Sequence, residues 1–430
     1  MSAAVWRLGG SVGRLGGAVG FPLLVLAATF VVTTPFILMA GVDPLAAYAE
    51  FLVKPLTTRF GLLEVLTSAI PLLFTGAAVA LAFRAGYWNI GAEGQLLLGA
   101  AAAAGVGMAV GGLPPVVAIP LVVLAGAVAG LLWALVPALL RVRLGIDEVV
   151  TTLLLNPVAL LLVEGLLNGP WRDPVTQFPE SQPIAASAEF PLLMERSRLH
   201  LGFAIALALI ALTWYVVART PTGLRLRAVG LSPQGARFAG IPVARVLLGA
   251  ALVSGAMAGI GGASEVAGIQ DRLTGGISSG AGYTGIVVAT LGGLSMPGVV
   301  LVALLLGDLS VGASSAGRAL GIPSQVGDVV QASVLLVTVA LLAMRRYGIG
   351  PWRARGGPAA GIEAAAAISP AAAVADLTDS TAGDDSTAGD GTPDGDDTPD
   401  GDDTPAGDDT PAGDGTPTGD DTPDRDEPRR

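Results

Sequence analysis

Long apolar runs separated by short polar segments dominate the first 350 residues of the chain. A helix needs about twenty apolar residues to cross the hydrocarbon of a bilayer, and only helices and closed barrels satisfy their backbone groups there. These runs therefore predict an all-α fold, a polytopic transmembrane helical bundle with about eight to ten spans. The predicted spans cover residues 21–41, 62–83, 94–110, 116–140, 149–167, 201–217, 246–269, 283–294, 299–311 and 329–344.

Two of these spans, 283–294 and 299–311, are short and are separated by Gly292, Gly293 and Pro297. A bilayer tolerates non-helical backbone only where protein or a water-filled cavity surrounds it. We therefore expect these two spans to form one broken or re-entrant hairpin.

The pattern changes completely after residue 357. Residues 358–430 contain 20 acidic residues and three arginines, and a Thr-Pro pair recurs every six residues from Thr392 to Thr422. Such a segment has too few apolar side chains to offset the entropy lost on ordering. The chain is therefore predicted to have a transmembrane domain over residues 1–357 and a disordered acidic tail over residues 358–430, which is either a solubilising extension or a docking segment.

Composition excludes several classes of protein. Of the 430 residues, 52% are hydrophobic and only 14% are charged, which is too apolar for an ordinary soluble domain. The absence of cysteine excludes a disulfide scaffold and a thiolate metal site. Because Lys54 is the only lysine and no glycine-rich phosphate loop surrounds it, any ATP that drives this protein is expected to be hydrolysed by another chain.

Candidate chemistry within the chain is equally sparse. We find no nucleophile with a neighbouring base, no paired carboxylates and no metal-ligand spacing, so neither catalysis nor a metal site is expected. Basic residues are not concentrated on one segment, which argues against a nucleic-acid partner. When the spans are laid alternately across the membrane, 14 arginines fall on the side of both termini and seven basic residues on the other, which predicts cytoplasmic termini in a plasma-membrane protein.

The polar run between the second and third spans is the first candidate site. Asn89, Glu93 and Gln95 lie within seven residues, and Gly86 and Gly91 permit non-helical backbone beside them. Polar groups at a span edge are costly unless they face a cavity or a partner. We expect this run to line a cavity, with a simple capped helix boundary as the alternative.

A second polar run opens the fifth span. Asp147 and Glu148 suit the positive N-terminal end of a helix. Thr152 and Asn156 lie four residues apart and therefore share a helix face, beside Pro157. That face could bind a polar solute or a neighbouring helix, and the spacing does not decide between them.

Residues 219–245 form the longest predicted cytoplasmic loop. Ser232 suits the N-cap of a short helix, and Pro233 suits its first position. Leu231 and Phe238 would project from it, and Gly240 suits its termination. This short helix is predicted either to dock a partner protein or to rest on lipid headgroups.

Other features in the spans are expected to serve packing. Glycines at 126, 130, 255 and 259 have the spacing of close helix contacts. The isolated acids Glu164, Glu265 and Asp308 could couple transport to an ion, but their spacing indicates no relay.

Three segments together resemble a known family. Residues 86–95 resemble the Asn-Ile-Gly-x-Glu-Gly-Gln signature of permease subunits in the branched-chain amino acid and simple-sugar class of ABC importers. Residues 148–156 resemble the Glu-x-x-x-Thr-x-x-x-Asn helix of its nucleoside and simple-sugar branch. Residues 230–241 resemble the cytoplasmic Gly-x-x-x-x-x-Ala-x-x-x-Gly-Ile segment of that branch, and the similarity extends over about residues 20–350.

The resemblance implies a permease that translocates a nucleoside or simple sugar with a second permease subunit, two cytoplasmic ABC ATPase subunits and an extracellular substrate-binding lipoprotein. The chain itself would bind no cofactor, since ATP is used by the ATPase. Residues that would line or support the translocation path are Asn89, Glu93, Gln95, Thr152 and Asn156. The ATPase coupling helix would comprise Gly230, Ser232, Pro233, Ala236, Arg237, Phe238 and Gly240.

Three alternatives follow from the sequence. The solute could be a branched-chain amino acid. The chain could instead be a secondary transporter driven by an ion gradient, although no inverted repeat of broken helices is evident. A structural or receptor protein would conduct no solute.

Overall fold

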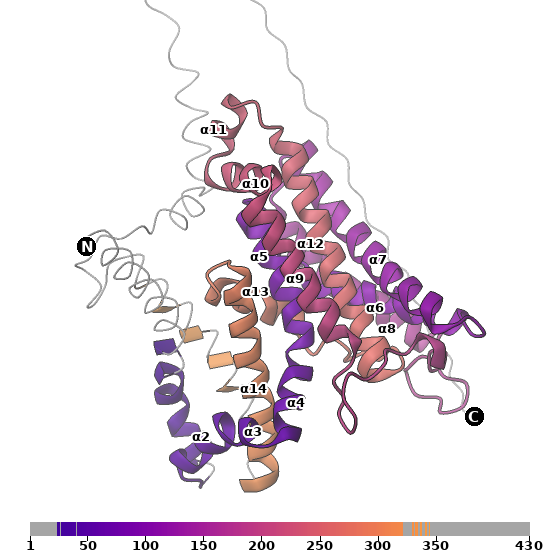
Figure 1. Ribbon diagram of the computed structural model, residues 1–430, viewed down its shortest axis with the longest axis vertical. Helices are drawn as coiled ribbons and strands as arrows, with labels where there is room; N and C mark the ends of the chain where they lie inside the picture. Colours follow the sequence, from indigo (N-terminus) through magenta and orange to yellow (C-terminus); the bar gives the residue numbers. More distant parts are fainter. Residues whose placement is uncertain are drawn as a thin grey trace, which may run out of the picture. The chain divides into compact units, whose positions relative to one another are not determined.

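The computed structural model describes residues 24–25, 27–39, 41–320 and part of 329–344. These residues are mainly helical, and their only extended pairings are two isolated bridges. The labelled helices in Figure 1 are α2 (Pro44–Leu52), α3 (Lys54–Thr57), α4 (Arg59–Ser68), α5 (Ile70–Arg84), α6 (Ala92–Ala109), α7 (Pro115–Leu144), α8 (Glu148–Asn168), α9 (Leu201–Arg219), α10 (Pro221–Leu231), α11 (Pro233–Phe238), α12 (Val243–Glu265), α13 (Ala281–Leu291) and α14 (Met296–Leu320). The predicted all-α fold is confirmed, and the predicted acidic tail lies outside the described residues.

Six stretches of described helix are long and apolar enough to cross a membrane. They are Arg59–Arg84, Pro115–Leu144, Glu148–Asn168, Leu201–Arg219, Val243–Gln270 and Met296–Leu320. The first combines α4 with α5, and the fifth combines α12 with the π-helical turn η2 (Val266–Gln270). The predicted spans 21–41 and 329–344 fall on incompletely described residues, of which Ala27–Met39 form an apolar helix. The chain is therefore a multi-pass membrane protein.

The structure corrects the prediction of a broken hairpin formed by two short helices. Only α13 is short, with 11 residues, whereas α14 has 25 residues and is long enough to span the bilayer alone. The turn between them is tight because a Cβ atom on Gly298 would come within 2.1 Å of the Gly292 carbonyl oxygen. Sequence hydropathy missed the second half of α14 because serines and an arginine replace apolar residues there.

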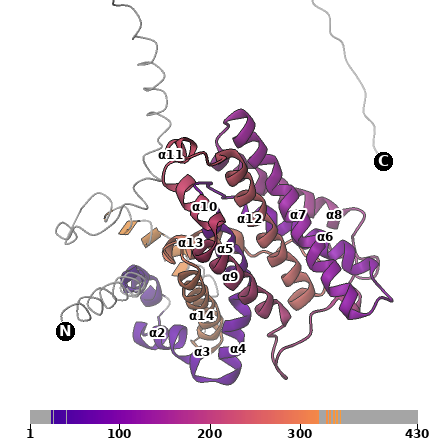
Figure 2. The ribbon, with the colours of Figure 1, turned by 45° about the horizontal axis from the view of Figure 1, so that its top comes forward.

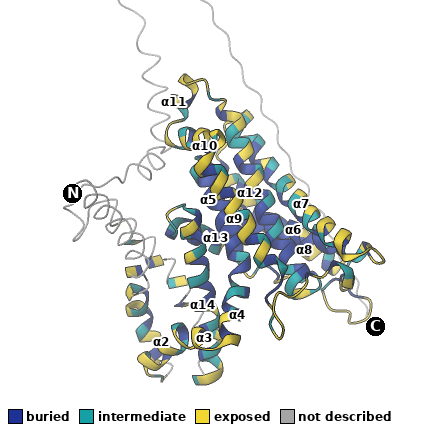
Figure 3. Cartoon of the chain, viewed as in Figure 1, coloured by how far each residue is buried: buried dark blue, intermediate teal, exposed yellow. Residues whose placement is uncertain are grey.

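The centre of the bundle is built from α5 and α6, which are the darkest helices in Figure 3. In the most apolar part of Arg59–Arg84, 83% of the residues are buried, compared with 22% in the corresponding parts of α7 and α8. Large apolar side chains on α7 and α8, such as Leu124 and Leu161, are exposed. Exposed apolar faces of this kind suit contact with lipid.

Small residues bring α7 and α12 into close antiparallel contact. Gly126 meets Ala263, Gly130 meets Gly259, and Gly255 meets Ala134. At Gly259 a Cβ atom would lie only 2.1 Å from the Gly126 carbonyl oxygen, so the two backbones touch with no room for a side chain. The predicted packing role of these glycines is confirmed.

Both α6 and α13 begin in the interior of the bundle. The N-terminal part of α13 contacts α5, where Thr75 donates a hydrogen bond to the Ala281 carbonyl at 3.0 Å. The first turn of α13 also lies against that of α6, since a Cβ atom on Gly282 would come within 2.3 Å of Glu93. Each of these helices follows a long helix and a non-helical segment, residues 85–91 or 271–280.

The two long helices, α5 and α12, run antiparallel. Ser254 lies beside Ala78, and Gly261 lies beside Phe74. The arrangement of long helix, non-helical segment and interior helix therefore occurs twice, with opposite directions of the long helices. The sequence does not reveal this inverted arrangement, because the two copies have no polar pattern in common.

Candidate translocation site

The first non-helical segment, residues 85–91, turns the chain back into the bundle after α5. Gly86 makes this turn with φ +78°, a left-handed conformation that favours glycine. Its position is also crowded, because a Cβ atom there would lie 3.3 Å from Gly230 Cα of α10. The segment thus contacts α10 at one end and carries the polar run Asn89 to Gln95 into the interior.

One face of α8 supplies hydrogen bonds to this segment. Glu148, Thr152 and Asn156 lie four residues apart and are all buried. The Trp88 N–H donates to Glu148 Oε1 and the Ile90 N–H donates to Thr152 Oγ1, both at 3.3 Å.

Asn156 makes the best-formed contacts of this face. Its Oδ1 accepts from the Gly94 N–H at 3.0 Å, and its Nδ2 donates to the Ile90 carbonyl at 2.9 Å. Buried backbone groups that lack a helical partner require such substitutes. The polar face of α8 therefore replaces the hydrogen bonds that a continuous helix would have made.

Asn89 and Gln95 form a second contact on the other side of the segment. Asn89 Nδ2 donates to Gln95 Oε1 at 2.9 Å, and Gln95 Nε2 donates back to Asn89 Oδ1 at 3.1 Å. Asn89 Nδ2 also donates to Ser254 Oγ of α12, whose hydroxyl donates to the Ala78 carbonyl of α5. This chain of bonds ties three helices, α5, α6 and α12, to the non-helical segment.

Glu93 joins the two interior helices. Its Oε2 accepts from the Gly282 N–H of α13 at 2.8 Å, and its Oε1 accepts a short hydrogen bond from the Ser278 hydroxyl. A carboxylate at the first turn of a helix interacts favourably with the helix dipole and with free N–H groups. Glu93 therefore holds residues 278–282 against the start of α6.

The five predicted path residues are buried in this conformation, each 7% exposed or less. The structure brings Asn89, Gln95, Thr152 and Asn156 together around residues 88–94, and it places Glu93 at the contact with α13. Their hydrogen bonds to one another and to backbone make them supports of the interior segment here, while direct contact with a solute stays a prediction.

Three residues that contribute to this site are not among the predicted path residues. Ser254 directly precedes the small-residue run 255–259, which is predicted to serve packing, and Ser278 lies in a segment with no distinctive pattern. Local charge assigns Glu148 to the helix terminus, and only the family motif includes it; in the structure it also pairs with Arg141 at 2.9 Å. Its spacing of four from Thr152 was the available signal, since it places both on one helix face.

The predicted coupling segment contains two helices, α10 and α11, where one was expected. Ser232 Oγ caps α11 by accepting from the Gly235 N–H at 3.0 Å, and Gly240 follows the helix with φ +76°. Phe238 is 94% exposed and Leu231 is 55% exposed, as predicted, whereas Ala236 is buried. Both helices lie at one end of the bundle, which we call the α11 end (Figures 1 and 2).

Gly230 belongs to α10, and its role differs from that of α11. A Cβ atom on Gly230 would come within 2.2 Å of the Arg84 carbonyl oxygen. Gly230 therefore packs α10 closely against the start of residues 85–91. The exposed surface of the predicted coupling segment is accordingly on α11.

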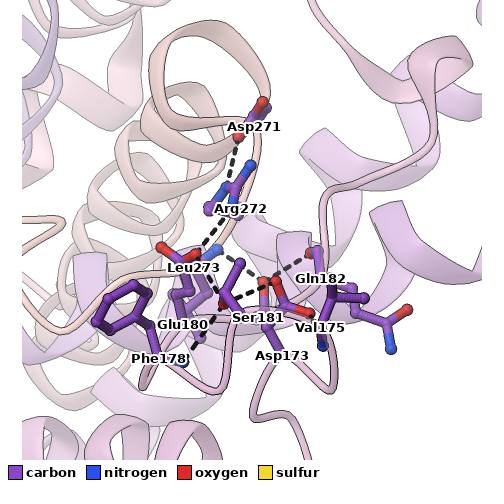
Figure 4. Close-up of polar contacts among 10 residues, drawn as sticks. Asp173, Val175, Phe178, Glu180, Ser181, Gln182, Asp271, Arg272 and Leu273 are labelled. Atoms are coloured by element: carbon purple, nitrogen blue, oxygen red, sulfur yellow. Dashed lines mark hydrogen bonds and ion pairs between the residues drawn. The ribbon is translucent and has the colours of Figure 1, made fainter.

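At the opposite end, which we call the loop end, residues 169–200 pack on α6 and on residues 271–274. Figure 4 shows Arg272 bonded to Glu180 and to Asp271, both at 2.9 Å. Ser181 and Leu273 exchange two hydrogen bonds of 2.9 Å between them. The second non-helical segment, 271–280, is therefore held at one end by the loop and at the other by Glu93.

Asp173 organises the loop itself. The Val175 N–H donates to Asp173 Oδ1 at 2.9 Å, and the Thr176 hydroxyl donates to Oδ2 at 3.0 Å. These hydrogen bonds favour the ionised carboxylate and so lower the pKa of Asp173, and the bond from the Val175 N–H has the largest effect.

Comparison with known proteins adds an independent finding. Residues 61–339 match the family model described as branched-chain amino acid transport system / permease component. The glucose ABC transporter permease protein TsgB13 of Haloferax volcanii is 38% identical over 343 residues, covering 77% of this chain and 90% of the relative. The guanosine ABC transporter permease protein NupP of Bacillus subtilis is 37% identical, covering 66% and 82% respectively. The nucleoside ABC transporter permease protein NupB of Lactococcus lactis is 30% identical, covering 73% and 88%. No solved structure matches the chain.

Proposed function

Since the chain belongs to the permease family of ABC importers, we propose that it conducts a nucleoside or a simple sugar across the membrane with energy from ATP hydrolysed by separate partner subunits. The observation that carries this proposal is similarity along nearly the whole length of a glucose permease, with further similarity to guanosine and nucleoside permeases. A branched-chain amino acid is the alternative solute, because the matching family model bears that description.

The partners follow from the same proposal. The complex contains a second permease subunit, two ABC ATPase subunits and an extracellular substrate-binding lipoprotein. α11 seats on an ATPase subunit, supported by its exposed Phe238 and by Arg237 in its last turn. The α11 end then faces the cytoplasm with both termini, and the loop end faces the lipoprotein.

Asn89, Glu93, Gln95, Thr152 and Asn156 support the path in this proposal by holding the two interior helices. Their movement would expose amide and carboxylate groups that can pair with solute hydroxyls or base edges. The inverted arrangement of α5–α6 and α12–α13 is also compatible with a secondary transporter. The exposed α11 favours the importer, because a self-contained carrier has no need for a docking helix.

Proteoliposomes distinguish these functions. The chain alone should accumulate neither labelled glucose nor labelled guanosine against a gradient, whereas the complete complex with ATP and loaded lipoprotein should accumulate one of them. Uphill uptake by the chain alone would establish a carrier. Uptake of leucine in place of both other solutes would replace the proposed solute class.

The docking role of α11 has its own test. Arg237→Glu combined with Phe238→Ala should abolish stimulation of ATP hydrolysis by loaded lipoprotein, because the variant removes the exposed aromatic and reverses the charge. Tyr215→Ala, which removes a 56% exposed aromatic from α9, outside both α11 and residues 169–200, is the matched control and should retain stimulation. Normal coupling in the double variant would refute the assignment.

A further inference from the structure

The second half of α14 is unusually polar for a membrane helix. Over residues 308–318 it carries Asp308, three serines and Arg318. Polar groups within a span are costly in lipid and generally face protein or a water-filled cavity. The location of these side chains therefore indicates where water or solute enters the bundle.

A cavity lies against this part of α14. Its volume is about 670 Å³, within the range of roughly 300–1,000 Å³ typical of sites for small molecules. One wall is formed by Ser310, Ser314, Ser315 and Arg318 of α14, and the facing wall by the α3–α4 region. Arg198, from the loop end of the bundle, also lines the cavity.

Hydroxyl groups line both walls. Ser68 of α4 faces the cavity from one side, and Ser310 and Ser315 face it from the other. Among the described residues none provides a hydrogen-bond partner for these three hydroxyls. A hydroxyl both donates and accepts hydrogen bonds, so this lining matches a solute that carries several hydroxyl groups.

The charges in the cavity are largely paired. Arg198 pairs with Glu64, and Lys54 pairs with Glu50. Arg318 has no acidic partner in the described part of the chain, and it is exposed. Because Arg198 and Lys54 are paired and the other polar groups are mostly hydroxyls, the lining favours a neutral solute. Phe60, which is 66% exposed at the cavity, offers an aromatic face for a sugar ring or base.

We propose that this cavity between α4 and α14 is the outer site at which the permease receives a neutral, polyhydroxylated solute. The proposal rests on the proposed function, because it names the entry point of the same transport path. It places first contact on α14 serines, while the buried amides of residues 89–95 act deeper in the bundle.

The natural absence of cysteine permits a direct test. In the complete importer, Ser310→Cys should react with a membrane-impermeant cationic thiol reagent added at the lipoprotein side. Modification should lower initial uptake at least tenfold. Saturating glucose or guanosine, whichever is transported, should slow labelling at least threefold. Leu45→Cys is the control, since Leu45 is 79% exposed on α2, lies outside residues 169–200 and does not line the cavity; it should react without loss of uptake.

The outcomes separate this proposal from the proposed function. Suppose that unmodified Ser310→Cys takes up solute, that modification leaves uptake unchanged, and that solute does not slow labelling. The cavity assignment is then wrong and the transport function stands. If glucose 6-phosphate protects and neutral solutes do not, the solute class is wrong. Should Ser310→Cys fail to assemble, Ser68→Cys tests the facing wall by the same criteria. If the unsubstituted complex hydrolyses ATP but takes up neither neutral solute, the proposed function fails first.

Discussion

Asn156 is the residue on which the interior segment most depends. Its side chain satisfies the Gly94 N–H at 3.0 Å and the Ile90 carbonyl at 2.9 Å, and the residue is only 1% exposed. Asn156→Leu keeps the volume similar but leaves both backbone groups buried without partners. Each such group costs about 1–3 kcal/mol, so we expect a loss of about 4 kcal/mol in the free energy of unfolding.

The matched control is Asn168→Leu on the same helix. Asn168 is an exposed amide that donates to the Glu164 carbonyl, so its loss should cost less than about 0.5 kcal/mol. Unfolding in mixed micelles, titrated with dodecyl sulfate and followed by tryptophan fluorescence, measures both variants. Equal stability of the two would refute the view that α8 replaces missing helical hydrogen bonds.

Two further predictions concern packing and pH. Gly259→Ala should destabilise the protein by about 3 kcal/mol, because its Cβ would lie 2.1 Å from the Gly126 carbonyl oxygen. The control is Gly249→Ala on the same helix, whose Cβ meets nothing within 4 Å and should not destabilise the protein. Equal stability of the two variants in micellar unfolding would contradict this prediction. Burial lowers the pKa of His200 from 6.5 to about 4. As the pH falls, the unfolded chain therefore takes up this proton before the folded chain does. About 3 kcal/mol of stability, which is fully present above pH 6.5, should be lost as the pH falls to 4. His200→Asn should remove that part of the slope in unfolding measured against pH, and an unchanged slope would exclude His200 as its source.

Hydropathy located the spans well because lipid imposes a length and a composition on each of them. Five of the six long helices coincide closely with predicted runs, and the face shared by Thr152 and Asn156 follows from helical periodicity alone. The short helix after Ser232 was equally accessible, because N-capping is a local effect.

The interior starts of α6 and α13 could not be obtained in this way. Their backbone groups are satisfied by side chains distant in sequence: Asn156 bonds to Gly94, and Glu93 bonds to Gly282. Ser254 looks like one more small residue in α12 until the fold places it beside Asn89. Such long-range pairs have no period in the sequence.

The bond between Glu93 and the start of α13 joins two segments that lead to opposite ends of the bundle. One segment runs from it to α10 at the α11 end, and the other runs to Arg272 and the loop that holds it. A motor that displaces α10 and a delivery protein that displaces the loop would pull on opposite ends of one linkage. In the proposed importer, Glu93 would therefore couple lipoprotein binding at the loop end to ATP hydrolysis at the α11 end.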